Sequence, residues 1–260
     1  MQYRLTIYIC RSQAALEGGA ELLAIYKKDI RAYFSSIYGY VITMSFYAAA
    51  GIVFVSQNIL HESSDLKPLF DTLAKFMILL VPLITKNAVA FERKNGTDRM
   101  LLTSPVSIFR IVLSKYLACM TILFICIACS AIFMAITAVC GKLAFGEAMV
   151  SFLGFMMLGS AMVSVGILIS SMMSEEKTAG VVIFVVMSFL LIISMVTKSI
   201  PVGLSESVLF ILSPYSFMEY YEAGILSFAS ILYYLCLSFI ALRFAGRSIC
   251  LLYTSPSPRD

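Results

Sequence analysis

The residues best suited to chemistry form a charged segment of nineteen residues, Glu92–Arg110, inside an otherwise apolar chain. Six charged side chains surround an apolar patch at Met100, Leu101 and Leu102. A loop that only connects two membrane helices does not need an apolar patch, whereas a loop that docks onto a soluble protein does. The alternative interpretation is a solvated basic turn that only fixes membrane orientation. We therefore expect this segment to recognise a protein rather than to catalyse a reaction.

Helix-breaking residues divide this segment. Gly96 ends the preceding helix, Thr97 can cap a new one, and Pro105 suits the first position of the helix after it. The pattern predicts a short helix over Thr97–Leu102 that lies across the membrane normal. The residues expected to shape this segment or to contact its partner are Glu92, Arg93, Gly96, Thr97, Arg99, Met100, Leu101, Leu102 and Pro105.

Other candidate sites are weak. Cys126-x-x-Cys129, together with 15 Met, could hold copper(I), but buried Cys packs as a small apolar residue and we favour that interpretation. The one histidine, His61, is expected in an external loop, and the sequence contains neither H-E-x-x-H nor a G-x-x-x-x-G-K-[ST] phosphate loop. We predict no catalytic residue, metal or cofactor in this chain.

The composition places the chain in a bilayer. Hydrophobic residues make up 60%, charged residues 13%, and the mean hydropathy is +0.93, whereas soluble domains carry about 25% charged residues. Apolar runs are long enough for helices to cross about 30 Å of hydrocarbon. The predicted spans are 37–57, 69–91, 111–140, 149–173, 179–198 and 225–242.

The second of these spans has only ten uncharged residues, Phe76–Thr85, so the basic residues decide whether it crosses. With six spans and both termini inside, 15 of the 19 Lys and Arg lie on the inner side, against 12 with five spans. Basic residues favour the cytoplasmic side, so this distribution predicts six spans with both termini in the cytoplasm. The expected location is the plasma (inner) membrane.

Two further segments have recognisable patterns. Residues 21–36 predict an amphipathic helix in the cytoplasmic interface, with Lys27, Lys28, Arg31, Tyr33 and Phe34 as its characteristic residues; a plain juxtamembrane extension is the alternative. Near the other face, Ser213-Pro214 begins a short external helix that Gly224 can end. The aromatic residues of that helix, Tyr215, Phe217, Tyr220 and Tyr221, are expected in an interfacial belt.

Residues 21–250 are expected to form a single membrane domain. Residues 1–20 are an uncertain extension, and residues 251–260 have the composition of a non-native tail.

Residues 91–115 resemble a signature stretch of the permeases of ABC-2 type transporters. The resemblance rests on Glu92-Arg93, Gly96-Thr97, Leu101-Leu102-Thr103-Ser104-Pro105 and Lys115. Residues 26–34 and Ser213-Pro214 further resemble the gliding-motility and nitrous-oxide-maturation branch. The resemblance implies an all-α polytopic membrane protein with six transmembrane helices, an N-terminal amphipathic interfacial helix and a short cytoplasmic coupling helix.

The resemblance also implies a function. The chain would be the permease subunit of an exporter and form half of the translocation pathway. Its partners would be a separate ABC ATPase that binds ATP and Mg, a second permease copy or paralogue, and the lipid bilayer, with no nucleic acid. Alternatives are a membrane-embedded enzyme, for which the apolar runs offer no catalytic group, and a scaffold or channel without ATP coupling.

Overall fold

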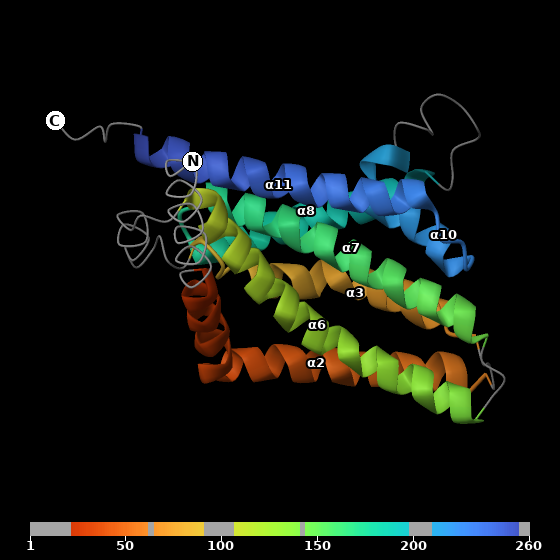
Figure 1. Ribbon diagram of the computed structural model, residues 1–260. Helices are drawn as coiled ribbons and strands as arrows, with labels where there is room; N and C mark the ends of the chain where they lie inside the picture. The colour runs from red at the N-terminus through yellow and green to blue at the C-terminus, as the bar shows by residue number, and fades with distance from the viewer. Residues whose placement is uncertain (1–21, 62–64, 91–106, 141–143, 198–209, 255–260) are drawn as a thin grey trace, which may run out of the picture.

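The computed structural model describes residues 22–61, 65–90, 107–140, 144–197 and 210–254, and within these ranges it is entirely helical (Figure 1). An N-terminal helix covers residues 22–35. The elements that follow are α2 (Ile37–Phe54), the π-helix η1 (Val55–Ile59), α3 (Lys67–Thr85), α6 (Ile108–Cys140), α7 (Phe145–Met172), α8 (Glu176–Thr197), the 3₁₀-helix η2 (Pro214–Phe217), α10 (Met218–Glu222) and α11 (Phe228–Thr254).

Six of these helices are long and apolar enough to span a membrane. Their ranges are Ile37–Ile59, Lys67–Thr85, Ile108–Val139, Phe145–Met172, Glu176–Thr197 and Phe228–Cys250. They run side by side, and helix 22–35 lies across one end of the bundle, steeply inclined to α2 (Figure 1). We call this end, where α2, α6 and α8 begin and α3, α7 and α11 end, the basal end. The predicted all-α, six-span architecture is confirmed.

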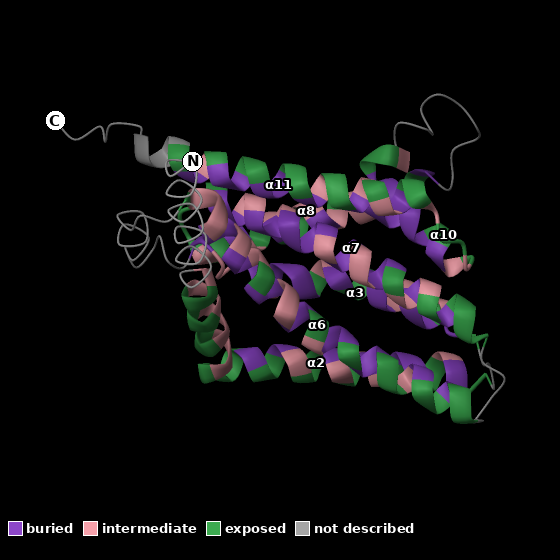
Figure 2. Ribbon diagram, in the orientation of Figure 1, coloured by how far each residue is buried: buried purple, intermediate pink, exposed green. Residues whose placement is uncertain are grey.

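The core of the bundle lies around α3 and α7. In each, 56% of the most apolar window is buried, against 28% for α8. Figure 2 shows exposed residues on the outer faces of α2 and α11, and many of these are large and apolar, among them Met44, Ile52 and Phe239. Such faces would be costly in water but suit hydrocarbon, so the helices expose to lipid the residues that a soluble bundle would bury.

Helix α7 packs closely against its neighbours through small residues. Three of its glycines admit side chains from other elements, namely Gly154 (Tyr221), Gly159 (Leu123) and Gly166 (Thr85). Ser164 of the same helix is fully buried, and its hydroxyl donates to the carbonyl of Ala161 at 2.6 Å.

The short helix at the end of the bundle opposite the basal end has the predicted boundaries. Pro214 occupies its first turn, and Gly224 follows the end of α10 with a φ of +75°. The amides of Gly224 and Ile225 donate to the carbonyls of Tyr221 and Tyr220, at 3.0 and 2.9 Å, which is the hydrogen-bond pattern of a Schellman motif. Gly224 is required there because other residues are strained at positive φ.

The expected aromatic belt is wrong for most of its members. Tyr215, Phe217 and Tyr221 are buried, and only Tyr220 is exposed. Phe217 stacks on Tyr233 of α11 with centroids 4.2 Å apart, and Tyr221 fills the space above Gly154. These rings therefore hold the short helix on the bundle rather than at the membrane interface.

The last helix continues beyond its predicted end. The last span was predicted to end at residue 242, yet α11 runs to Thr254, and therefore through the first four residues of the predicted tail. The guanidinium of Arg243 lies 4.6 Å from the ring centroid of Phe109 in α6. This cation–π contact gives the charge a partner at the basal end, so the helix can leave the apolar region without unwinding.

Candidate functional site

Most of the predicted recognition segment, Glu92–Arg110, lies outside the described residues. Glu92, Arg93, Gly96, Thr97, Arg99, Met100, Leu101, Leu102 and Pro105 all fall within 91–106, so their roles stay predictions. The structure does describe the chain on either side, at residues 86–90 and from Ser107 onward. The contacts of these two segments show which helices a movement of the recognition segment would displace.

The chain that follows α3 is fastened to α7 by Ser170. The backbone amides of Val89 and Ala90 donate to Ser170 Oγ, at 3.4 and 3.3 Å. The same hydroxyl donates to the carbonyl of Lys86 at 3.4 Å. One buried serine thus satisfies three backbone groups after the helix ends, where unpaired groups would be costly.

An ion pair fastens the same segment to α8. Lys86 Nζ lies 3.1 Å from Glu176 Oε1, and it also lies 4.6 Å from the centroid of the Tyr38 ring in α2. Burial tends to lower the pKa of Lys86, but the interactions with Tyr38 and Glu176 outweigh it and the pKa is raised. Lys86 therefore remains charged at neutral pH, and it connects α2, α3 and α8 at the basal end.

Thr85, the last residue of α3, lies in a space that Gly166 leaves open on α7. A Cβ atom built on Gly166 would lie 2.5 Å from Thr85 Oγ1 and 3.1 Å from its Cβ and Cγ2 atoms. Thr85 is fully buried, and its hydroxyl donates to the Val81 carbonyl at 2.8 Å. The end of α3 therefore contacts the backbone of α7 directly, and Ser170 lies one turn further along α7.

The beginning of α6 is fastened to helix 22–35. The carbonyl of Ser107 accepts from the amides of Arg110 and Ile111, so this residue begins the helix. Further along, Lys115 Nζ lies 3.7 Å from Asp29 Oδ2, and the Tyr26 hydroxyl donates to Thr121 Oγ1 at 2.8 Å. Two polar contacts thus join the N-terminal helix to the first four turns of α6.

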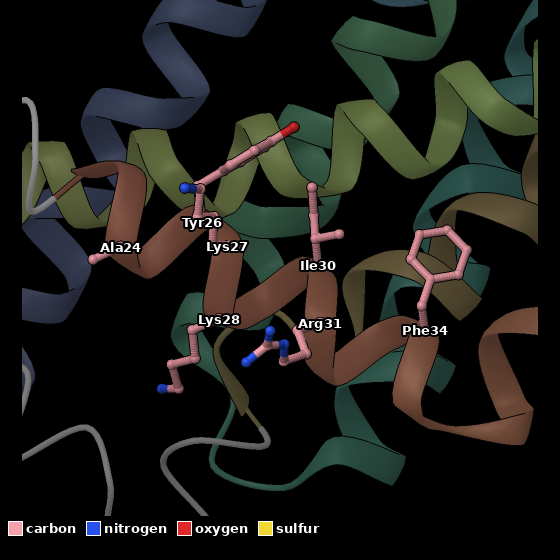
Figure 3. A pocket seen from close by; sticks show the side chains of 7 residues that line it. All are labelled: Ala24, Tyr26, Lys27, Lys28, Ile30, Arg31 and Phe34. Carbon is pink, nitrogen blue, oxygen red and sulfur yellow. The ribbon is translucent and has the colours of Figure 1, made fainter.

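Helix 22–35 is amphipathic, as predicted. Lys27, Lys28 and Arg31 are exposed, whereas Tyr33 and Phe34 are half-buried. Figure 3 shows Tyr26, Ile30 and Phe34 on one side of the helix and Lys28 and Arg31 on the other. This arrangement suits a helix that rests its apolar side on the bundle and turns its basic side outward.

Sequence reasoning missed the two ion pairs. Nothing in the sequence pairs Lys86 with Glu176, whereas in the structure each is the partner of the other. The sequence did indicate that Asp29 needs a partner. This acid lies on the apolar side of helix 22–35, three residues from Tyr26 and four residues from Ile25 and Tyr33. An acid at such a position needs a partner, and Lys115 supplies it.

The cysteine pair remains within the apolar core. Cys126 and Cys129 are both buried free thiols in α6. Among the described residues, no three His, Cys, Asp or Glu side chains lie close enough to hold a metal ion.

Comparison with known families identifies the chain. A family model described as ABC-2 family transporter protein matches residues 69–246, well over half of the sequence. The chain belongs to the ABC-2 family of transporter membrane proteins. The comparison with curated proteins gave no match. Members of this family are transport subunits without an ATPase domain, so membership implies a partner ABC ATPase. The match runs from the first turn of α3 to the second half of α11, and it therefore includes the recognition segment.

Proposed function

We propose that this ABC-2 protein is the permease subunit of an ATP-driven exporter in the plasma (inner) membrane. It belongs, in this proposal, to the gliding-motility and nitrous-oxide-maturation branch, whose members it resembles in residues 26–34 and at Ser213-Pro214. Both termini face the cytoplasm, ATP and Mg are bound by the partner ATPase, and a second permease copy or paralogue supplies the other half of the pathway.

The observation that carries the proposal is the anchoring of both sides of residues 91–106. On one side, Ser170 and Glu176 tie residues 86–90 to α7 and α8. On the other side, Asp29 and Tyr26 tie α6 to helix 22–35. A partner that displaces residues 91–106 would therefore also displace the packed helices on either side. Movement of packed helices is what switches access between the two membrane faces.

The first test concerns ATP and assembly. We expect the purified chain to hydrolyse no ATP, and to gain hydrolysis only when its cognate ATPase is added. Because six spans form half of a pathway, the assembled transporter should contain two permease chains, measurable by light scattering of the purified complex. ATP hydrolysis by the isolated chain, or a complex with a single permease chain, would contradict the proposal. An assembly that lacks an ATPase would favour the scaffold or channel alternative.

The second test concerns orientation. His61 and Ser174 are both exposed and lie at opposite ends of the bundle. In a variant without the seven native cysteines, a membrane-impermeant maleimide added to intact cells should label His61→Cys and spare Ser174→Cys. Permeabilised cells provide the control, because both positions should then react. Labelling of Ser174→Cys in intact cells would place the basal end outside and reject the topology.

A further inference from the structure

A cavity of about 410 Å³ lies between helix 22–35 and the basal end of the bundle. Its walls come from helix 22–35, the start of α2, the end of α3 with residues 87–88, and the first half of α6. Ligand sites in proteins typically occupy about 300–1,000 Å³, whereas one water needs about 30 Å³. The cavity therefore has the size of a ligand site and is too large for a single bound water.

The polar side of the cavity contains two atoms with unsatisfied hydrogen-bonding capacity. Tyr33 Oη and Asn87 Oδ1 are both buried, and neither has a hydrogen-bond partner in the described part of the chain. Lys115, with only 4% of its side chain exposed, also lines the cavity beside Asp29. A buried polar atom without a partner is costly, so two of them at one cavity favour the binding of a polar group there.

The lining changes from polar to apolar with depth. Along α6, Lys115 is nearest the basal end, and Ala118, Cys119 and Ile122 follow toward the middle of the helix. Seven residues of α-helix span about 10 Å, so the gradient extends over that depth. On α3 the order is the same, with Asn87 beyond the helix end and Ile84 within it. A ligand that matches this lining has a polar group at the basal end of the bundle and an apolar group toward the middle of the helices.

We propose that this cavity binds the headgroup and upper acyl region of a phospholipid that carries a primary ammonium group, as phosphatidylethanolamine does. The phosphate accepts from Lys115 Nζ and the Tyr33 hydroxyl, and the ammonium donates to Asn87 Oδ1 beside the Asp29 carboxylate. The acyl chain lies along Ala118 and Ile122. The bound lipid then joins helix 22–35 to α3 and α6, and this inference does not depend on ATP coupling.

Phosphatidylcholine is the discriminating probe, because it shares the phosphate and acyl chains but has no N–H group to donate. The full chain, purified from membranes in detergent, is mixed with equal amounts of dioleoyl phosphatidylethanolamine and dioleoyl phosphatidylcholine, and bound lipid is counted by native mass spectrometry. One charge-assisted hydrogen bond supports about a tenfold preference for the ethanolamine lipid. Equal retention of the two lipids by the wild-type chain would overturn the proposal.

Variants locate the preference in the cavity. Asn87→Leu should reduce it to within about twofold, and Ala118→Phe, which fills the cavity, should abolish retention of both lipids at this site. Leu117→Phe is the matched control, because Leu117 is the exposed neighbour of Ala118 on the same helix and should leave the preference unchanged. A preference that persists in Ala118→Phe would place the lipid elsewhere and reject the site.

A competition experiment distinguishes binding of a membrane lipid from binding of a free headgroup. Glycerophosphoethanolamine presents the same phosphate and ammonium without acyl chains. At concentrations equal to that of the lipid it should displace no bound phosphatidylethanolamine, because it cannot use the apolar depth of the cavity. Equal competition would show that the cavity takes a soluble phosphate ester, and would overturn the assignment to a lipid.

Discussion

Replacing Leu101 with alanine is expected to weaken binding of the partner ATPase by about 2–4 kcal/mol, which is roughly a 30- to 1,000-fold loss of affinity. The reason is the sequence pattern at Met100, Leu101 and Leu102, an apolar patch inside a charged segment that the proposed topology places in the cytoplasm. Large apolar side chains at the centre of an interface carry much of its binding energy. The measurement is capture of the ATPase by the detergent-solubilised variant, with insertion of the variant into membranes as the folding check.

Two comparisons make this result specific. Gly96→Val should also release the ATPase, because a bulky residue does not suit the turn that we expect to lay Thr97–Leu102 flat on the partner. Arg93→Ala should have a smaller effect, mainly on the rate of association and its salt dependence, because we expect Arg93 at the rim of the interface. If Leu101→Ala and Gly96→Val both bind and transport normally, while charge reversal at Arg93 disturbs topology, the segment is only a basic turn that fixes orientation.

The features predictable from the sequence depend on local length and local chemistry. Five of the six spans follow from apolar runs long enough to cross a bilayer, and a basic, amphipathic pattern gives helix 22–35. The short helix at residues 214–222 follows from Pro at its start and Gly after its end, since each residue type has a conformational reason to be there. The second span is the exception, because only the distribution of Lys and Arg along the whole chain predicts that it crosses.

The features that escaped prediction depend on residues distant in sequence. Glu176 is the partner of Lys86, and Lys115 is the partner of Asp29, at sequence separations of 90 and 86 residues. Phe217 and Tyr221, which were assigned to an interfacial belt, are buried because α11 supplies an aromatic surface for them, at Tyr233 and Tyr234. Nothing local distinguishes a tyrosine that meets headgroups from one that meets another helix, so only the packing decides.

The two ion pairs lie at the basal end, on the segments that flank the recognition segment and on the helices that these segments contact. Its N-terminal side is joined to α7 and α8, and its C-terminal side leads into α6 and from there to helix 22–35. The two sides therefore lead to different groups of helices. Under the proposed function, a displacement of residues 91–106 would separate or bring together these groups, and the contact between α3 and α7 at Gly166 must hold for the displacement to be transmitted.

Gly166→Ala is accordingly expected to destabilise the protein by about 1–3 kcal/mol, the usual cost of adding atoms to a packed core. The added Cβ would lie 2.5 Å from Thr85 Oγ1. Thr85 cannot yield easily, because it is fully buried, β-branched and hydrogen-bonded to Val81. The strain would push α3 away from α7 and loosen the contacts of Ser170 with residues 86–90. Thermal unfolding of the purified protein in detergent measures the loss.

The matched control is Gly51→Ala in α2, where an added Cβ meets no atom within 4 Å. This variant should be neutral or slightly stabilising, because alanine favours helix over glycine. Thr85→Ala removes Oγ1 and Cγ2, two of the three Thr85 atoms that lie within 3.1 Å of the added Cβ, so the double variant Gly166→Ala with Thr85→Ala should lose less stability than the sum of the single variants. Additive losses, or a Gly166→Ala variant as stable as Gly51→Ala, would show that α3 and α7 do not meet at this point and that the proposed transmission through it is wrong.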